Sequence, residues 1–371
     1  MKIGILTFHC AHNFGAVLQC YALQEALKEM GHEVFIIDYR PDYLINPYKV
    51  FSFQRIKSKN PIKIIVKLII ELLSIKARII KDKGFCKFIN TLFNLYPITQ
   101  LSNQSDFDLF VFGSDQIWNP KFNNNKLDPI FLGSSPIFSH TPKIAYAASM
   151  GCKKLADPKQ ESKFIQGIQT FKSISVREKS LQEYIFKVSG IKSKIVVDPT
   201  LLLSSIQYEK LIGERKIKEN YIFIYQVGRS EHLTKNLDYL EKKSKKKIIN
   251  ISACGRIYLN QINELKYTPY DFLNLIKYAD LILTTSFHGT VFSCIFQKNF
   301  YTFSVNENVD DRSKNLLKSL SLEERMIDNV SKIKDLPINY NLVNPILKNI
   351  QTESLIWLKK SIKISNNKNS D

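Results

Sequence analysis

Residues 279–305 read ADLILTTSFHGTVFSCIFQKNFYTFSV, and the pattern of this stretch decides the fold that we expect. A short apolar run typical of a strand covers 280–285, and a second one covers 300–305. Between them, Ser286 is a residue type that caps helices, and 290–297 has the apolar spacing of a helix. A strand, a helix and a strand in this order predict a parallel α/β sheet whose strand ends form a ligand-binding edge.

His288 and Gly289 stand at the predicted start of that helix. The unpaired N–H groups and the dipole of a first helical turn favour an anion. An imidazole in such a place can transfer protons near neutral pH. A histidine that merely caps its own helix has the same sequence position, so both interpretations stay open.

The alternation of strands and helices recurs along the chain and divides it into two halves. Polar or small residues follow most of the predicted strands, as a ligand-binding sheet edge requires. We therefore predict two Rossmann-like α/β domains that face a cleft, the first at 1–205 and the second at 206–340, followed by a helix and tail at 341–371. A basic helical insertion is expected within the first domain, at about 47–95. The predicted strands are 2–7, 33–39, 107–112, 143–147, 173–176, 195–197, 221–226, 247–252, 280–285 and 300–305.

The chain is strongly basic, with 53 Lys and Arg against 34 Asp and Glu, a net charge of +19. Neither of its basic segments, 55–87 and 235–247, shows zinc-finger spacing or interleaved aromatic residues, so we expect no nucleic-acid partner. Lysines within 61–93 alternate with Ile, Leu and Phe, which is typical either of a helix on an anionic membrane surface or of a solvated helix face. The apolar run 62–80 carries five charged residues and is not expected to cross a membrane.

Cysteine and histidine spacing gives little sign of a disulfide or metal site. The six cysteines form no C-x-x-C pair, and the start MKIGILTF does not resemble a signal peptide. His9 and His12 have no second pair of ligands at a usable spacing. We therefore expect a cytoplasmic protein with reduced cysteines and no metal.

Seven further segments, taken together, resemble a known family. They span nearly the whole chain in the order in which the family has them: HNFGAVLQCYAL (12–23), FGSDQIWNP (112–120), YAASMG (146–151), SVRE (175–178), VVDPTLLL (196–203), TSFHGTVFSCIF (285–296) and DDRSKNLLKSLSLEERM (310–326). With these segments the chain resembles the polysaccharide pyruvyl transferases.

The resemblance implies a glycosyltransferase-B-like fold with the site in its cleft. It also implies transfer of pyruvate from phosphoenolpyruvate to two hydroxyls of a saccharide, forming a ketal in the synthesis of an exopolysaccharide or capsule. No cofactor is expected besides phosphoenolpyruvate as co-substrate. A lipid-linked acceptor and a peripheral place on the inner face of the cytoplasmic membrane would fit this chemistry.

The resemblance also assigns residues. It places His288 and Arg177 at the donor, with Arg312 as the basic residue downstream. The ordinary pKa of an imidazole suits His288 to the proton transfer. The helix start adds Ser286 and Gly289 to the donor site through backbone donors.

For the acceptor, the residue types suggest four positions and one catalytic partner, and all of them except Gln116 have a structural alternative. Asp115 is a candidate base or orienting group, or a turn-forming residue. Asn13 and Gly15 line the same predicted edge or form a backbone turn, and Gln116 belongs to the loop of Asp115. Trp118 stacks on a sugar ring or is buried in a core.

One position departs from the family pattern. Many members carry an arginine two residues before the histidine, where this chain has Ser286. The lost anion contact would then come from Arg312 or Lys298.

Two other functions fit the same residues: a glycosyltransferase that uses a nucleotide sugar, and a saccharide-binding protein that has lost its donor site.

Overall fold

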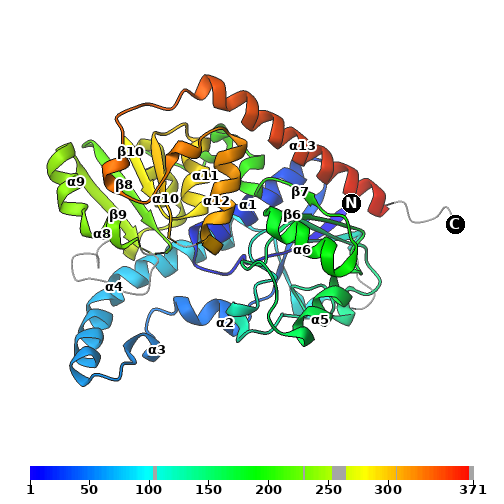
Figure 1. The fold of residues 1–371 in the computed structure, drawn as a ribbon. Helices are drawn as coiled ribbons and strands as arrows, with labels where there is room; N and C mark the ends of the chain where they lie inside the picture. The colour runs from blue at the N-terminus through cyan, green and yellow to red at the C-terminus, as the bar shows by residue number, and fades with distance from the viewer. Residues whose placement is uncertain (103–106, 229, 253–264, 306, 367–371) are drawn as a thin grey trace. The chain divides into compact units, whose positions relative to one another are not determined.

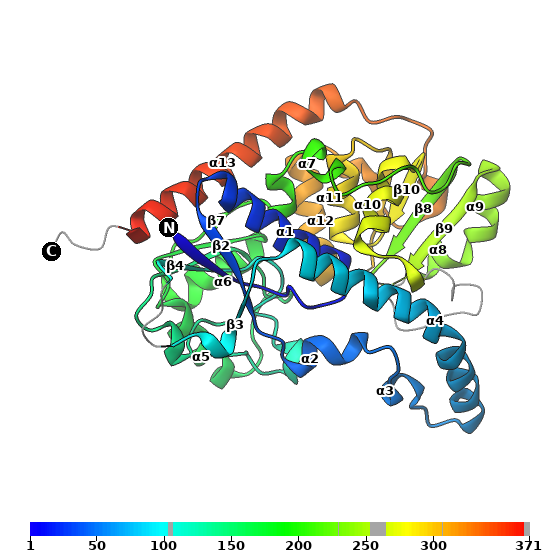
Figure 2. The ribbon, with the colours of Figure 1, turned by 180° about the vertical axis from the view of Figure 1, so that it is seen from behind.

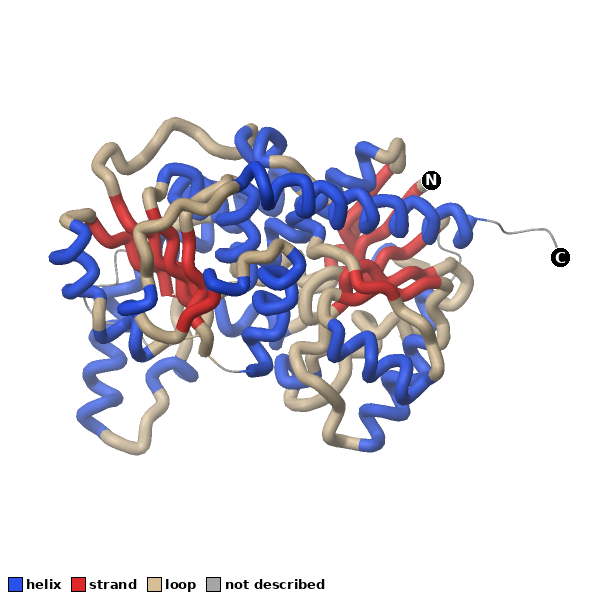
Figure 3. Tube along the Cα trace, turned by 45° about the horizontal axis from the view of Figure 1, so that its top comes forward, coloured by secondary structure: helices blue, strands red, loops and turns tan. Residues whose placement is uncertain are grey.

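The structure is a computed structural model that describes residues 1–102, 107–228, 230–252, 265–305 and 307–366. Contacts within the chain divide it into two units. Unit 1 comprises Met1–Ile45, Ile89–Leu203 and Pro345–Asp371, and unit 2 comprises Asn46–Phe88 and Ser204–Asn344. Figure 3 shows the strands of each unit in red with blue helices beside them.

Unit 1 is built on a seven-stranded sheet in the order β3-β2-β1-β4-β5-β6-β7, in which every pairing is parallel. Apolar runs such as LFVF in β4 are buried throughout, as expected for a sheet covered on both faces. Its strands are β1 (Lys2–Leu6), β2 (Glu33–Asp38), β3 (Leu95–Pro97), β4 (Leu109–Phe112), β5 (Lys143–Ala148), β6 (Ser173–Val176) and β7 (Lys194–Ile195). Its helices include α1 (Phe14–Glu29), α2 (Asp42–Ile45), α5 (Pro158–Ile168) and α6 (Lys179–Ser189).

Unit 2 is built on a five-stranded parallel sheet in the order β12-β11-β10-β8-β9. Its strands are β8 (Tyr221–Gln226), β9 (Lys247–Ser252), β10 (Leu281–Thr284), β11 (Phe300–Phe303) and β12 (Met326–Ile327). Its helices are α3 (Phe53–Ile56), most of α4 (Pro61–Leu92), α7 (Ser205–Glu209), α8 (Glu231–Lys235), α9 (Leu237–Ser244), α10 (Pro269–Tyr278), α11 (Phe287–Ile295) and α12 (Glu307–Ser319). Labels in Figure 1 mark β8, β9 and β10 with α10 and α11 beside them.

The prediction of two parallel α/β domains is confirmed. The chain passes from unit 1 to unit 2 after Ile45 and again after Leu203, and it returns to unit 1 after Phe88 and after Asn344, so neither unit is one continuous segment. The basic helical segment was expected in the first domain, but its contacts group Asn46–Phe88 with unit 2. The reason is the packing of α4 on the start of α10. A β-carbon at Gly84 would collide with the Thr268 side chain, and the Phe88 and Tyr270 ring centroids lie 5.2 Å apart.

The last helix, α13 (Tyr340–Asn366), begins in unit 2 and continues in unit 1. The Tyr340 hydroxyl donates to the backbone O of Lys298 in unit 2 (2.7 Å). Further along, Gln351 Nε2 donates to the backbone O of Leu201 (2.6 Å), and Ser354 Oγ accepts from the backbone N of Val197 (3.1 Å), both in unit 1. Among the described residues, no helix has the length and apolar content that crossing a membrane requires.

Candidate active site

The carboxyl end of β10 in unit 2 is held by threonine side chains. Thr284 Oγ1 donates to the backbone O of Tyr225 (2.7 Å), and Thr285 Oγ1 donates to that of Gly228 (2.7 Å). Both threonines are buried, so these bonds fix the backbone where the strand passes into α11. The turn is therefore anchored to the neighbouring strand β8 before the helix begins.

Ser286 is the N-cap of helix α11, as the sequence predicted. The first helical residue is Phe287, whereas the sequence indicated Thr290. Ser286 Oγ accepts a hydrogen bond from the backbone N of Gly289 (3.4 Å). A β-carbon at Gly289 would collide with Thr284 Oγ1, so only glycine lets the first turn approach the strand this closely. Backbone N–H groups of this turn lie at the sheet edge, as an anion site requires.

His288 is the second residue of α11 and keeps 8% of its surface exposed. Its ring meets the edge of Phe287, with centroids 5.3 Å apart. The guanidinium of Arg312, on α12, lies 5.4 Å from the centroid of the Phe287 ring. The Phe287 ring, at the start of the helix, is thus near both the His288 imidazole and the permanent cation of Arg312.

Lys298, the alternative source of the missing cation, lies elsewhere in unit 2. It follows the carboxyl end of α11, and Asp280, just before β10, is the carboxylate that acts on its charge. Burial outweighs this attraction and lowers the pKa of Lys298. Lys298 is therefore at the amino edge of the strands, whereas Arg312 contacts Phe287 in the first turn of α11.

In unit 1, Asp115 follows β4 in the left-handed region, with φ of 72°. Its backbone O accepts from the backbone N of Ser149 (3.0 Å), and its Oδ1 accepts from the backbone N of Gln116 (2.8 Å). Non-glycine residues rarely adopt this conformation, which is sustained only where surrounding bonds determine it, most often at functional sites. Asp115 thus forms the predicted turn and also presents a carboxylate at the sheet edge.

Arg177 follows β6 and is buried with its charge matched by two carboxylates. Its Nη1 donates to Asp198 Oδ2 (2.5 Å) and its Nη2 to Asp115 Oδ1 (3.4 Å). Burial alone would lower the pKa of Arg177, but Asp198 and then Asp115 outweigh it and raise that pKa. The arginine therefore holds Asp115 in place, and a substrate anion would compete with these carboxylates for its guanidinium.

A second buried carboxylate, Glu178, lies next to Arg177 at the same edge. Ser149 Oγ donates to Glu178 Oε1 (2.5 Å), and both residues are buried. Glu178 was not among the predicted site residues, although it ends the segment SVRE and Ser149 lies in YAASMG. Each of these residues follows one of two neighbouring parallel strands, and the carboxyl ends of such strands meet at one edge of the sheet. This signal could have placed Ser149 next to Glu178.

The four predicted acceptor residues have structural tasks in unit 1. Asn13 caps α1 by accepting from the backbone N of Ala16 (3.3 Å), and Gly15 is buried in the first turn of that helix. Gln116 Oε1 accepts from Asn119 Nδ2 (2.6 Å). Trp118 has no exposed surface, its Nε1 donates to the backbone O of Phe131 (3.2 Å), and its ring packs in the core. The interpretation of Trp118 as a sugar platform is corrected, because its aromatic ring is surrounded by other core side chains.

The structure therefore gathers the predicted residues into two groups, each at the carboxyl edge of one sheet. Asp115 and Arg177 are in direct contact in unit 1. Ser286, His288 and Gly289 form the start of α11 in unit 2, and Arg312 lies near the Phe287 ring of the same turn. His9 belongs to neither group, since its Nε2 lies 2.8 Å from Asp38 Oδ1 and its Nδ1 lies 3.3 Å from the backbone O of Thr7.

Comparison with known proteins gives one family. The profile of a family described as polysaccharide pyruvyl transferase matches residues 13–307. No curated protein matches the sequence.

Solved structures similar to this chain share few of its residues. A UDP-GlcNAc 2-epimerase from Methanocaldococcus jannaschii is 15% identical, with a TM-score of 0.45, and the match covers 100% of this chain and 94% of that one. A glycosyltransferase from Streptomyces sp. SF2575, complexed with thymidine diphosphate, is 11% identical with a TM-score of 0.45, and the coverage is 97% and 99%. A putative UDP-N-acetylglucosamine 2-epimerase from Listeria monocytogenes is 9% identical with a TM-score of 0.47, and the coverage is 99% and 90%.

Proposed function

Because this chain belongs to the polysaccharide pyruvyl transferase family, we propose that it transfers pyruvate from phosphoenolpyruvate to two hydroxyls of a saccharide. The product is a cyclic ketal on a surface polysaccharide or its precursor, and no cofactor takes part besides the donor. The observation that carries the proposal is that the His288 ring and the Arg312 guanidinium both lie near the Phe287 ring at the start of α11.

The donor carries a phosphate and a carboxylate, and unit 2 offers groups that suit both. An arginine binds either anion through two parallel hydrogen bonds. The first turn of α11 adds backbone N–H groups and the positive end of a helix dipole. We assign donor binding to Arg312, Ser286 and Gly289, the two latter through the backbone of this turn.

The reaction needs one group that gives a proton to carbon. A proton added to the methylene carbon of the donor makes a methyl group, while a sugar hydroxyl oxygen bonds to the central carbon. The bond from that carbon to the phosphate oxygen then breaks, and a second hydroxyl oxygen closes the ring. Of the two hydroxyl protons released, one balances the proton on the methyl carbon and the other leaves with phosphate. His288 is the group in unit 2 whose chemistry suits this proton transfer.

Asp115 is our candidate for the base that accepts a hydroxyl proton from the acceptor. Its position is held by Arg177, whose own guanidinium is fixed by Asp198. In this assignment Arg177 is a positioning residue, which differs from the direct donor contact that the family resemblance implies. Replacement of Arg177 by lysine would remove the two-pronged contact and displace Asp115.

The first prediction concerns the donor site. We expect Arg312→Gln to raise the KM for phosphoenolpyruvate at least tenfold, because the cation at the start of α11 is lost. We expect His288→Ala to lower kcat by about a hundredfold or more, because the proposed proton-transfer group is lost. Lys318→Gln, an exposed change of equal charge on α12, is the matched control. Turnover is measured by mass spectrometry of oligosaccharide acceptors that gain pyruvate.

Thermal unfolding with added ligands, together with the same mass spectrometry, separates the two rival functions. Stabilisation by uridine diphosphate but not by phosphoenolpyruvate in thermal unfolding would favour a nucleotide-sugar transferase. Binding of the saccharide with no donor binding and no product would favour a binding protein. Either result would contradict the proposal, as would a His288→Ala variant with normal turnover.

A further inference from the structure

Helix α4 turns a polar face inward. Glu71 and Ser74 are buried, and Glu71 accepts from the backbone N of Ser52 (3.0 Å) and from Arg55 Nη2 (2.5 Å). On the same side of the helix, Arg78 Nε donates to Ser74 Oγ (3.0 Å), and its Nη2 lies 3.6 Å from Glu71. The segment that contains α3 is thus held to α4 by charged and polar contacts. Figure 2 shows α3 beside the first half of α4.

The opposite face of the same helix is apolar and exposed. Ile62 is 70% exposed, Leu72 is 53% and Leu73 is 56%. The exposed residues recur every three or four positions, so they form one stripe along the helix. The members of this exposed apolar stripe are Ile62, Ile65, Val66, Leu68, Ile69, Leu72, Leu73, Ile79 and Ile80. A soluble surface rarely leaves so continuous an apolar face in water, so the stripe is expected to be covered by a partner.

Exposed lysines continue the stripe. Lys76 lies within it, and Lys83 and Lys87 follow at spacings of seven and eleven residues, which bring them to the same side of the helix. The face therefore changes from apolar to cationic along its length. A single partner that offers hydrocarbon and negative charge together would match both parts.

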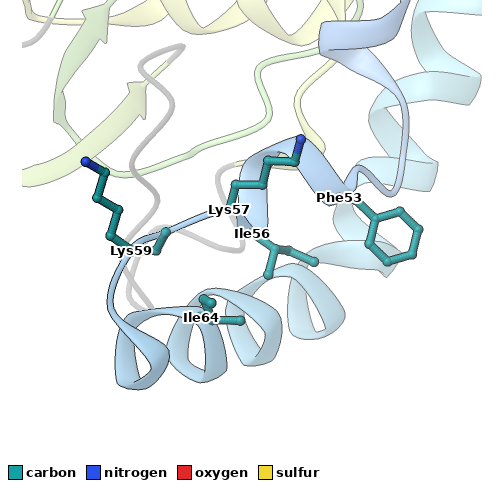
Figure 4. Close-up of a pocket in the computed structure, with 6 residues that line it drawn as sticks. Phe53, Ile56, Lys57, Lys59 and Ile64 are labelled. Carbon is teal, nitrogen blue, oxygen red and sulfur yellow. The ribbon is translucent and has the colours of Figure 1, made fainter.

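A hollow between α3 and the start of α4 also combines apolar side chains with lysines. It has a volume of about 620 Å³ and is lined by Phe53, Ile56, Lys57, Ser58, Lys59 and Ile64. In Figure 4, Ile56 points toward α4, while Lys57 and Lys59 extend away from that helix. Phe53, at its edge, is 75% exposed. Apolar walls with lysines nearby are suited to the acyl chain and headgroup of an anionic lipid.

We propose that the exposed stripe of α4 docks on an anionic membrane surface, with the helix lying in the interface. A second copy of the chain would suit the apolar residues, but a symmetric pairing would bring Lys76, Lys83 and Lys87 of both copies onto one interface. Anionic lipid headgroups instead attract these lysines, and hydrocarbon receives the stripe. The buried Glu71 with its two arginines keeps the inner face on the protein side, so the helix does not cross the bilayer.

The test is flotation of the full chain with vesicles of phosphatidylcholine and phosphatidylglycerol, compared with vesicles of phosphatidylcholine alone. Wild type should float with the anionic vesicles and lose binding as salt rises. Ile65→Ser with Leu72→Ser should weaken binding at least tenfold, because the inserted apolar area is lost. Lys83→Gln with Lys87→Gln should weaken it about thirtyfold, at roughly fivefold per lysine.

Matched controls exist on α13. Ile356→Ser removes an exposed apolar side chain, and Lys359→Gln with Lys360→Gln removes two exposed lysines, so both should bind as wild type does. The proposal is wrong if wild type ignores anionic vesicles or if both stripe variants float normally. A wild-type dimer that the Ile65→Ser, Leu72→Ser variant makes monomeric, without vesicle binding, would assign the stripe to a second copy. Donor and acceptor are absent from this assay, so its result does not depend on the proposed reaction.

Discussion

Asp38, at the end of β2, carries the clearest pH-dependent contact in unit 1. Its carboxylate accepts from His9 Nε2 (2.8 Å) and from Arg40 Nε (2.6 Å). Burial alone would raise the pKa of Asp38, but the hydrogen bonds from His9 and Arg40 outweigh it and lower that pKa from 3.8 to about 2. A lowered pKa stabilises the fold at every pH above the ordinary value, and this stabilisation disappears as the pH falls toward the folded-state value.

We therefore predict that Asp38→Asn removes part of the acid sensitivity of unit 1. The difference in unfolding free energy between wild type and Asp38→Asn should shrink by about 1–2 kcal/mol as the pH falls from about 6 to about 2, after allowance for partial exposure. Tryptophan fluorescence in urea measures this unit, because both tryptophans of the chain, Trp118 and Trp357, belong to it. Asp42→Asn, at an exposed position, is the control. Identical pH profiles for wild type and Asp38→Asn would contradict the assignment.

At single residues, the sequence predicted local roles such as helix capping better than contacts with residues distant in the chain. Ser286 was expected as a helix cap and is one, because capping depends on the three residues that follow. Arg177 was expected at the donor, yet Asp198 and Asp115 occupy its guanidinium, and both partners are distant in sequence. Trp118 had two interpretations that sequence could not separate, since burial is set by side chains from elsewhere in the chain.

Among the elements, α4 shows how an ion pair can replace an apolar contact on the inner face of a helix. Glu71 has both oxygens engaged by arginines, and its pKa is lowered because hydrogen bonds from Arg55 and the charge of Arg78 outweigh its burial. An uncompensated buried charge is far more costly than the pair is favourable. The contact between α3 and α4 should therefore depend on this one carboxylate.

Glu71→Gln tests that dependence. We expect amide hydrogen exchange in α3 and the first half of α4 to become about thirtyfold faster, which corresponds to about 2 kcal/mol of local stability, while β8 and β10 keep their protection. Hydrogen exchange with mass spectrometry resolves these segments. Glu231→Gln, in an exposed pair with Lys235 on α8, should change exchange little. If both variants behaved alike, the buried pair would not be what holds α3.

Elements with strong local patterns were predictable. The strands β8, β9 and β10 lie where apolar runs indicated them. Between β8 and β9 the chain forms two short helices, α8 and α9, which meet at Asn236; the amide Nδ2 of Asn236 donates to the backbone O of His232 (2.8 Å). The face of α4 that turns outward was not predictable, because an apolar stripe normally indicates the buried side.

For the whole molecule, the assignment of segments to units depends on contacts between distant parts of the chain. The contact of Gly84 with Thr268 places the basic helix in unit 2, and the bond from Gln351 to Leu201 places the end of α13 in unit 1. The alternation of strands and helices in the sequence predicts the number of α/β units, but nothing in the sequence indicates either contact. The residues of the candidate site are divided between the units in the same way.

This division predicts separate roles for the two units. Arg312→Gln, in unit 2, should reduce the stabilisation of the protein by phosphoenolpyruvate from about 2.7 kcal/mol for wild type, at a hundredfold excess over the wild-type Kd, to about 1.4 kcal/mol or less at the same donor concentration. Asp115→Asn, in unit 1, should keep that stabilisation and lose pyruvyl transfer by about a hundredfold or more, because donor binding is intact while the proposed base is absent. Thermal unfolding with and without donor, followed by circular dichroism, measures the first effect, and mass spectrometry of the acceptor measures the second. Unchanged tryptophan fluorescence would show that Asp115→Asn leaves the Trp118 core folded. If Asp115→Asn also lost stabilisation by the donor, the donor site would include unit 1, and Arg177 would return as its anion-binding residue.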